Sequence, residues 1–176
     1  HVAEAVARLR SDGLPVMLDF VGPGYPPALS RLRETLSRLD PEGSFLRYRG
    51  EVPFAQLHQT YQQADAFVFA SSCENLPNIL LEAMSSGLPV ACSRCSSMPE
   101  VLGNAGVYFN PEDPGEIAEV LRGLLLDPKL RHDCAQRAFE RSQGLSWERC
   151  ARETLQFLAA IAEKHLAGKR PSPIDV

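Results

Sequence analysis

The sequence has 176 residues, of which 44% are hydrophobic, and its formal net charge at neutral pH is −4. That length and hydrophobic content suit one globular domain with its own core. The mild acidic excess, without a cluster of Lys and Arg, excludes an obvious nucleic-acid-binding surface. We find neither an apolar run long enough to span a membrane nor a secretory signal, and therefore expect a cytoplasmic protein without a transmembrane segment.

The five cysteines are an odd number, which argues against a disulfide framework in a chain that can build its own core. Cys92 and Cys95 form a C-x-x-C pattern, which also occurs in redox pairs and in half of a zinc site. No second pair of Cys or His lies at ligand spacing. We therefore expect reduced thiols, no bound metal and no cofactor.

The first half of the chain alternates between helix and strand patterns. Apolar residues recur at helical spacing from residue 2 to residue 10, and the pattern ends at Asp12 and Gly13. An apolar run ended by glycines predicts a strand, and two prolines then open a helix. The expected elements after the first helix are a strand within 15–24, a helix at 26–40, a strand at 44–50, a helix at 53–64 and a strand at 65–71.

The second half carries clear helix-start signals. Asp113 is followed by a proline and, three residues after the cap, by Glu116, and Asp127 likewise precedes a proline. Ser146 opens the last long helix, which we expect to end near residue 164. The elements expected before these three helices are a helix at 77–86, a strand at 88–93, a short helix near 99–103 and a strand at 106–110.

Strands that alternate with helices through short connections predict an α/β, Rossmann-like fold, with a parallel sheet covered by helices on both faces. We assign one domain to residues 1–165 and expect the tail, 166–176, to be disordered. Ligands of such sheets bind at the carboxyl ends of the strands. The site is therefore sought at the strand ends.

Polar or glycine residues follow four of the expected strands. Gly22 and Gly24 end the first, Arg49, Gly50 and Val52 lie at the end of the second, and residues 71–74 and 93–100 follow the next two. The first two groups also have ordinary explanations. The glycines suit a tight turn, and the arginine suits a solvated loop.

The segment 74–82 is more informative because it contains two carboxylates in different settings. Pro77 suits the first helical turn, so Glu74 precedes the helix and Glu82 lies inside it. Glu82 interrupts an apolar helix, where a carboxylate is costly unless it is hydrogen-bonded. The vicinal hydroxyls of a ribose would satisfy it. The amides around Asn78 and Ile79, at the positive end of the helix, suit a phosphate.

The pair has two other interpretations. Glu82 could instead accept hydrogen bonds from the backbone of a neighbouring loop, with Glu74 a solvated charge. Alternatively, the pair could be the two carboxylates of a glycoside hydrolase, which face each other about 5 to 9.5 Å apart. Eight residues along one helix span about 12 Å, so the hydrolase interpretation is rejected.

The segment E-N-L-P-N-I-L-L-E-A-M-S-S-G-L-P-V resembles the E-x7-E segment of the group 1 (family 4) retaining glycosyltransferases of GT-B fold. The flanking sequences G-E-V-P-F-A-Q-L-H-Q-T-Y-Q-Q-A-D-A-F-V-F-A-S and L-S-W-E-R-C-A-R-E-T-L are similar to the same family. The resemblance covers about residues 14–160. It implies the C-terminal, donor-binding half of a GT-B enzyme.

The resemblance implies a role for each candidate residue. Glu82 would hold the ribose of a nucleoside-diphosphate sugar, and Glu74 would contact the donor sugar and stabilise its developing positive charge. The donor phosphate, not Glu74, is the usual base in this family, and no metal is needed. The other implied donor-binding residues are Asn75, Leu76, Pro77, Asn78 and Ile79 near the sugar and diphosphate, Arg49, Gly50 and Val52 beside the base, and Gly22 and Gly24 at the cleft border.

This sequence departs from the family pattern in three places. Asn75 and Leu76 replace the usual Gly-Phe, and Ser96 and Ser97 stand where a glycine commonly precedes the Pro-Glu pair. The family domain also begins with a strand and a loop whose Arg and Lys grip the diphosphate, and this chain starts beyond them. We therefore expect one GT-B half without its first strand. By itself it would bind nucleotide weakly or not at all and would not turn over.

We expect the intact enzyme to transfer a sugar to a saccharide, lipid or other acceptor, as in polysaccharide biosynthesis, with an N-terminal domain holding the acceptor. Its location would be cytoplasmic and would allow peripheral contact with a membrane. A catalytically inactive scaffold of the same fold is the alternative, although it would not require both Glu74 and Glu82. A GT-B epimerase or phosphorylase has the same architecture but gains no support from the motif spacing.

Overall fold

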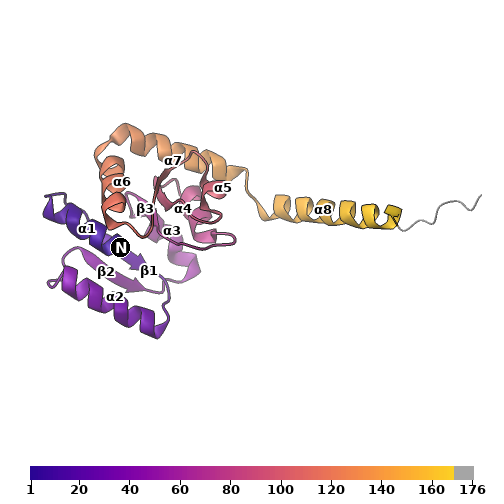
Figure 1. The fold of residues 1–176 in the computed structure, drawn as a ribbon. Helices are drawn as coiled ribbons and strands as arrows, with labels where there is room; N and C mark the ends of the chain where they lie inside the picture. Colours follow the sequence, from indigo (N-terminus) through magenta and orange to yellow (C-terminus); the bar gives the residue numbers. More distant parts are fainter. Residues whose placement is uncertain (169–176) are drawn as a thin grey trace, which may run out of the picture. The chain divides into compact units, whose positions relative to one another are not determined.

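The computed structural model describes residues 1–168, which fall into two compact units, His1–Ser142 and the residues from Gln143 onward. The first unit contains every candidate site residue. The second contains α8 (Trp147–Gly168), which is one continuous helix (Figure 1). Its last three residues belong to the predicted tail, and the rest of that tail lies outside the described residues. The assignment of residues 1–165 to one domain stays a prediction.

The first unit contains the helices and strands in the order that the sequence predicts. They are α1 (Val2–Ser11), β1 (Leu18–Val21), α2 (Pro26–Leu39), β2 (Leu46–Gly50), α3 (Phe54–Gln62), β3 (Phe67–Phe69), α4 (Asn78–Ser85), β4 (Val90–Ser93), α5 (Met98–Leu102), β5 (Val107–Phe109), α6 (Pro114–Leu126) and α7 (Pro128–Gln143). The predicted caps also form. Asp113 accepts hydrogen bonds from two amides at the start of α6, and Asp127 accepts two at the start of α7.

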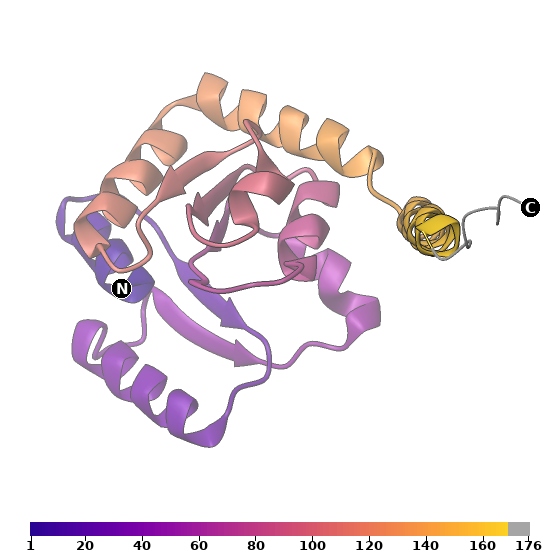
Figure 2. The same cartoon turned by 45° about the vertical axis from the view of Figure 1, so that its right-hand side comes forward.

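All five strands are parallel, in agreement with the predicted sheet type, but they form two ladders. β1 pairs with β2, and β4 lies between β3 and β5 (Figure 2). No strand joins β1 to β3 within residues 1–168. In a complete doubly wound sheet, the first strand lies between the strands that correspond to β1 and β3.

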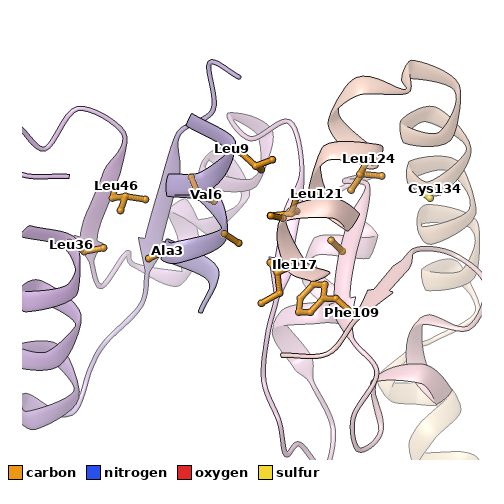
Figure 3. Close-up of a cluster of buried hydrophobic side chains, with 13 residues drawn as sticks. Ala3, Val6, Leu9, Leu36, Leu46, Phe109, Ile117, Leu121, Leu124 and Cys134 are labelled. Carbon is orange, nitrogen blue, oxygen red and sulfur yellow. The ribbon is translucent and has the colours of Figure 1, made fainter. Parts of the chain in front are cut away.

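The three-stranded sheet is buried on both faces, as successive residues of its strands show. In β4, Ala91 belongs to the hydrophobic cluster under α1 and α6, whereas Val90 and Cys92 belong to the cluster under α4 and α5. Figure 3 shows the first cluster, in which side chains of α6 such as Leu121 lie next to Leu9 of α1. Because side chains alternate along a strand, helices on both faces bury all four residues of β4, the central strand. The predicted α/β class is confirmed.

A buried carboxylate fixes the connection between α2 and β2. Asp40 is 5% exposed, and its two oxygens accept hydrogen bonds from the amides of Ser44, Phe45 and Leu46 and from the Ser44 hydroxyl, at 2.7–3.1 Å. Burial alone would raise the pKa of Asp40, but these hydrogen bonds outweigh it and lower the pKa to about 2. The ionised carboxylate therefore stabilises the folded loop.

In the second unit, the Ser146 hydroxyl accepts a hydrogen bond from the Arg149 amide, which confirms the predicted start of α8. The side chains of residues 147–165 are exposed, including the large apolar ones Trp147, Leu155 and Phe157. Among the described residues, no helix combines the length and the apolar character needed to cross a membrane.

Asp40→Asn should lower the melting temperature at neutral pH by several degrees, because the amide would turn an N–H toward amide donors. Since the folded-state pKa is lowered, the stabilisation is complete above the unfolded value near 3.8 and is lost as the pH falls toward 2. Thermal melts between pH 7 and pH 2 should therefore show the two proteins converging in acid. Glu42→Gln, in the same loop, is the control; an equal loss there, or a difference that does not shrink in acid, would contradict the assignment.

Candidate functional site

The glycines at the ends of β1 and β2 bring these two loops together. The Gly22 amide donates to the Gly50 carbonyl over 2.8 Å, and both glycines have a positive φ, +132° and +76°. A Cβ on Gly24 would lie 2.3 Å from Cδ2 of Leu29 in α2, so the loop packs closely on that helix. These three glycines therefore have a structural reason to be present, whatever they also contact in a ligand.

Arg49 and Val52, predicted to flank a nucleobase, differ in their surroundings. The Arg49 guanidinium is 3.2 Å from the Asp19 carboxylate, which also pairs with Arg47 at 2.7 Å. Asp19 is paired with Arg47 across the two strands, and Arg49 lies two residues further along β2, so all three side chains share one face of the two-stranded sheet. Arg49 is therefore engaged in an ion pair on that face. Val52 is half-buried in the connection from β2 to α3. No hydrogen bond or ion pair within residues 1–168 joins these loops to segment 74–82.

Glu74 lies in the loop between β3 and α4, and its backbone is bound by two serines of the loop between β4 and α5. The Ser96 hydroxyl accepts from the Glu74 amide at 3.2 Å and donates to the Glu74 carbonyl at 2.6 Å. The Ser97 hydroxyl donates to the same carbonyl at 3.0 Å. The Glu74 carboxylate has no hydrogen bond or ion pair within the described residues. Its backbone is therefore fixed, while its side chain is available to a ligand.

A further serine joins the same two loops one step closer to the sheet. Ser93 is completely buried at the end of β4, and its hydroxyl donates to the Ser71 carbonyl over 2.6 Å. It also accepts from the Cys95 amide at 3.3 Å. The strand ends that the sequence marked at residues 71–74 and 93–100 are thus brought together.

The start of α4 presents unpaired amides, as predicted, with one difference. Pro77 is the buried N-cap residue, and the Asn78 amide donates to the Leu76 carbonyl at 3.0 Å. The amides of Leu76 and Ile79 have no hydrogen-bond partner within the described residues. The amides of Leu76 and Ile79 are therefore free for an anion, whereas that of Asn78 is not, and exposed Asn75 lies beside them.

Glu82 is half-buried in the second turn of α4, and its partner is a side chain that the sequence did not single out. The Tyr61 hydroxyl, from α3, donates to Oε2 of Glu82 over 2.9 Å. Burial, together with the nearby carboxylate, raises the pKa of Tyr61 well above its usual value. Tyr61 is therefore a permanent donor at neutral pH. The other Glu82 oxygen, Oε1, has no partner within the described residues.

The cysteines do not form a second site. All five are free, and burial raises the pKa of the Cys92 thiol to about 12, so it is not a thiolate at neutral pH. No cluster of three or more His, Cys, Asp or Glu in the described part of the chain is placed to hold a metal ion. The expectation that no metal is needed stays a prediction.

The comparisons with known proteins agree on one family. The family model described as glycosyl transferases group 1 matches residues 1–127. The O-antigen chain mannosyltransferase B of Escherichia coli is 36% identical over 138 residues, which cover 74% of this chain and 36% of that protein.

Solved structures share the fold. Sucrose-phosphate synthase from Thermosynechococcus elongatus superposes with a TM-score of 0.77 at 23% identity, over 93% of this chain and 43% of that one. An Anabaena protein in complex with UDP gives 0.77 at 20% identity, over 90% and 44%. This chain therefore spans about a third of the curated relative and less than half of each structure. By its sequence and its α/β fold, the chain belongs to the group 1 glycosyl transferases.

Proposed function

We propose that this chain is the donor-binding half of a retaining glycosyltransferase, which moves a sugar from a nucleoside-diphosphate sugar to an acceptor hydroxyl. The observation that carries the proposal is the segment 74–82. There, a carboxylate without a partner precedes a helix start with free amides, and a second, half-satisfied carboxylate follows one turn later. The mannosyltransferase relative and the UDP-bound structure support the substrate class.

Glu82 is proposed to accept hydrogen bonds from the two ribose hydroxyls. A carboxylate offers about four acceptor positions, and Tyr61 fills only one of them. A half-buried acceptor of this kind gains more from a ligand hydroxyl than an exposed one does, because less water competes for it. The Tyr61 hydroxyl keeps the carboxylate turned in one direction before the ligand arrives.

The diphosphate is proposed to lie at the start of α4, where the Leu76 and Ile79 amides and the helix dipole favour negative charge. Arg49, Gly50 and Val52 would border the base, and Gly22 and Gly24 the same cleft. Glu74 would face the sugar. As the bond from the anomeric carbon to phosphate breaks, positive charge develops on the ring, and an adjacent carboxylate stabilises it.

The transfer step follows from this arrangement. The acceptor oxygen bonds to the anomeric carbon on the face that the phosphate leaves, so the configuration is kept, and the acceptor proton passes to the departing phosphate. We propose no bound metal, a cytoplasmic location and an acceptor held by a second domain. Activity that survives a chelator would support the proposed absence of a bound metal.

Glu82→Gln should weaken binding of the preferred nucleotide at least tenfold, because the amide replaces an acceptor by a donor facing ribose hydroxyls. Isothermal calorimetry with UDP, GDP and ADP in turn measures the affinities and identifies the base. Glu112→Gln, in an exposed loop, is the matched control. Equal affinities for Glu82→Gln and the unmodified protein would refute the ribose role.

Tyr61→Phe removes only the hydroxyl and keeps the ring, whose centroid is 6.1 Å from that of Phe67. We expect the nucleotide dissociation constant to rise about fivefold to tenfold, with little change in melting temperature. Tyr108→Phe, which removes a hydroxyl bound to the Gly103 carbonyl, is the control and should leave affinity unchanged. An unaltered dissociation constant in Tyr61→Phe would mean that Glu82 needs no such orientation.

Glu74→Gln in the intact enzyme should lower kcat by about 100-fold and change donor affinity by less than about threefold, because the lost charge acts mainly in the transition state. Steady-state kinetics with the preferred nucleotide sugar, combined with calorimetry, separate the two effects. A nearly normal kcat would show that Glu74 does not face the reacting sugar.

A further inference from the structure

Ser96 has the backbone conformation of a glycine. Its φ is +53°, and it is the one non-glycine residue with positive φ in the described part of the chain. Side chains are disfavoured there, and such conformations persist where surrounding contacts hold them in place. The Ser96 hydroxyl makes two hydrogen bonds to the Glu74 backbone, and these bonds offset the cost of the positive φ.

Both the amide and the carbonyl of Glu74 are hydrogen-bonded to serine hydroxyls. Its amide donates to the Ser96 hydroxyl, and its carbonyl accepts from the hydroxyls of Ser96 and Ser97, which occupies both carbonyl lone pairs. A glycine at position 96 would adopt the same φ without strain but could make neither hydroxyl bond. The serine therefore adds a connection to Glu74 that the glycine, with its easier backbone, would lack.

We propose that Ser96 and Ser97 are positioning residues, which fix the direction of the Glu74 side chain toward the donor sugar through the Glu74 backbone. This inference rests on the proposed function of Glu74 and extends it to a second loop. The two residues before Glu74, Ser72 and Cys73, and the two after it, Asn75 and Leu76, are all exposed. Ser93 binds the base of this loop at Ser71, and the two serines bind its tip.

Ser96→Gly tests the proposal without damage to the fold, because glycine relieves the positive φ. The melting temperature should stay the same or rise, and nucleotide affinity should stay within about twofold, while kcat falls about tenfold or more as Glu74 loses its orientation. Ser97→Ala should lower kcat in the same direction, and Ser97→Thr, which keeps a hydroxyl, should restore it. Ser72→Ala, in the Glu74 loop but without a bond to Glu74, is the control.

Hydrogen exchange of the Glu74 amide gives a second readout that does not depend on turnover. Ser96→Gly should speed this exchange severalfold, and Ser72→Ala should not. Unchanged protection of Glu74, or an unchanged kcat in Ser96→Gly, would overturn the proposed positioning role. The proposed function would fail in a different way, if the unmodified intact enzyme neither bound nucleotide nor transferred sugar. In that case the exchange measurement would still show whether the serine hydroxyls fix the Glu74 backbone.

Discussion

Burial of β4 on both faces is the constraint on which the candidate site depends. All four of its residues are buried, and its neighbours β3 and β5 align with it in parallel register. The loops that leave β3 and β4 must therefore emerge side by side at the same edge of the sheet. The hydroxyls of Ser93, Ser96 and Ser97 connect the two loops there by hydrogen bonds. The position of the Glu74 backbone is therefore fixed relative to the packed sheet.

Three carboxylates differ in their surroundings, in line with the structural role of Asp40 and the roles proposed for Glu82 and Glu74. Asp40 is buried and accepts four hydrogen bonds from one loop, which leaves it no capacity for a ligand. Glu82 is half-buried and has one partner, Tyr61. Glu74 has a fixed backbone and a carboxylate without a partner among the described residues. The number of carboxylate acceptor positions without a partner therefore rises from Asp40 through Glu82 to Glu74. This order is the one expected for a residue that stabilises a loop, a residue proposed to bind the ribose and a residue proposed to act on the sugar.

Much of this architecture could be predicted from local patterns. Apolar periodicity, Pro at helix starts and the caps at Asp113 and Asp127 identified the elements, because these signals act within a few residues. The interruption between β1 and β3 has no such local signal, and the expectation of a domain without its first strand came only from the family resemblance. Tyr61 could not be predicted as the partner of Glu82, since 21 residues separate them and the contact depends on how α3 packs beside α4. Likewise, Ser96 and Ser97 were visible only as a departure from the family glycine, and their bonds to Glu74 required the structure.

A nucleotide sugar is proposed to bind at the strand ends around α4. Amide NMR of the intact protein, titrated with UDP, GDP and ADP, tests it most directly because each amide reports its own surroundings. We expect selective shifts at residues 50–52 and 76–82 for one nucleotide, together with a shift at Ser96. Shifts confined to another part of the surface, or none at millimolar nucleotide, would contradict it.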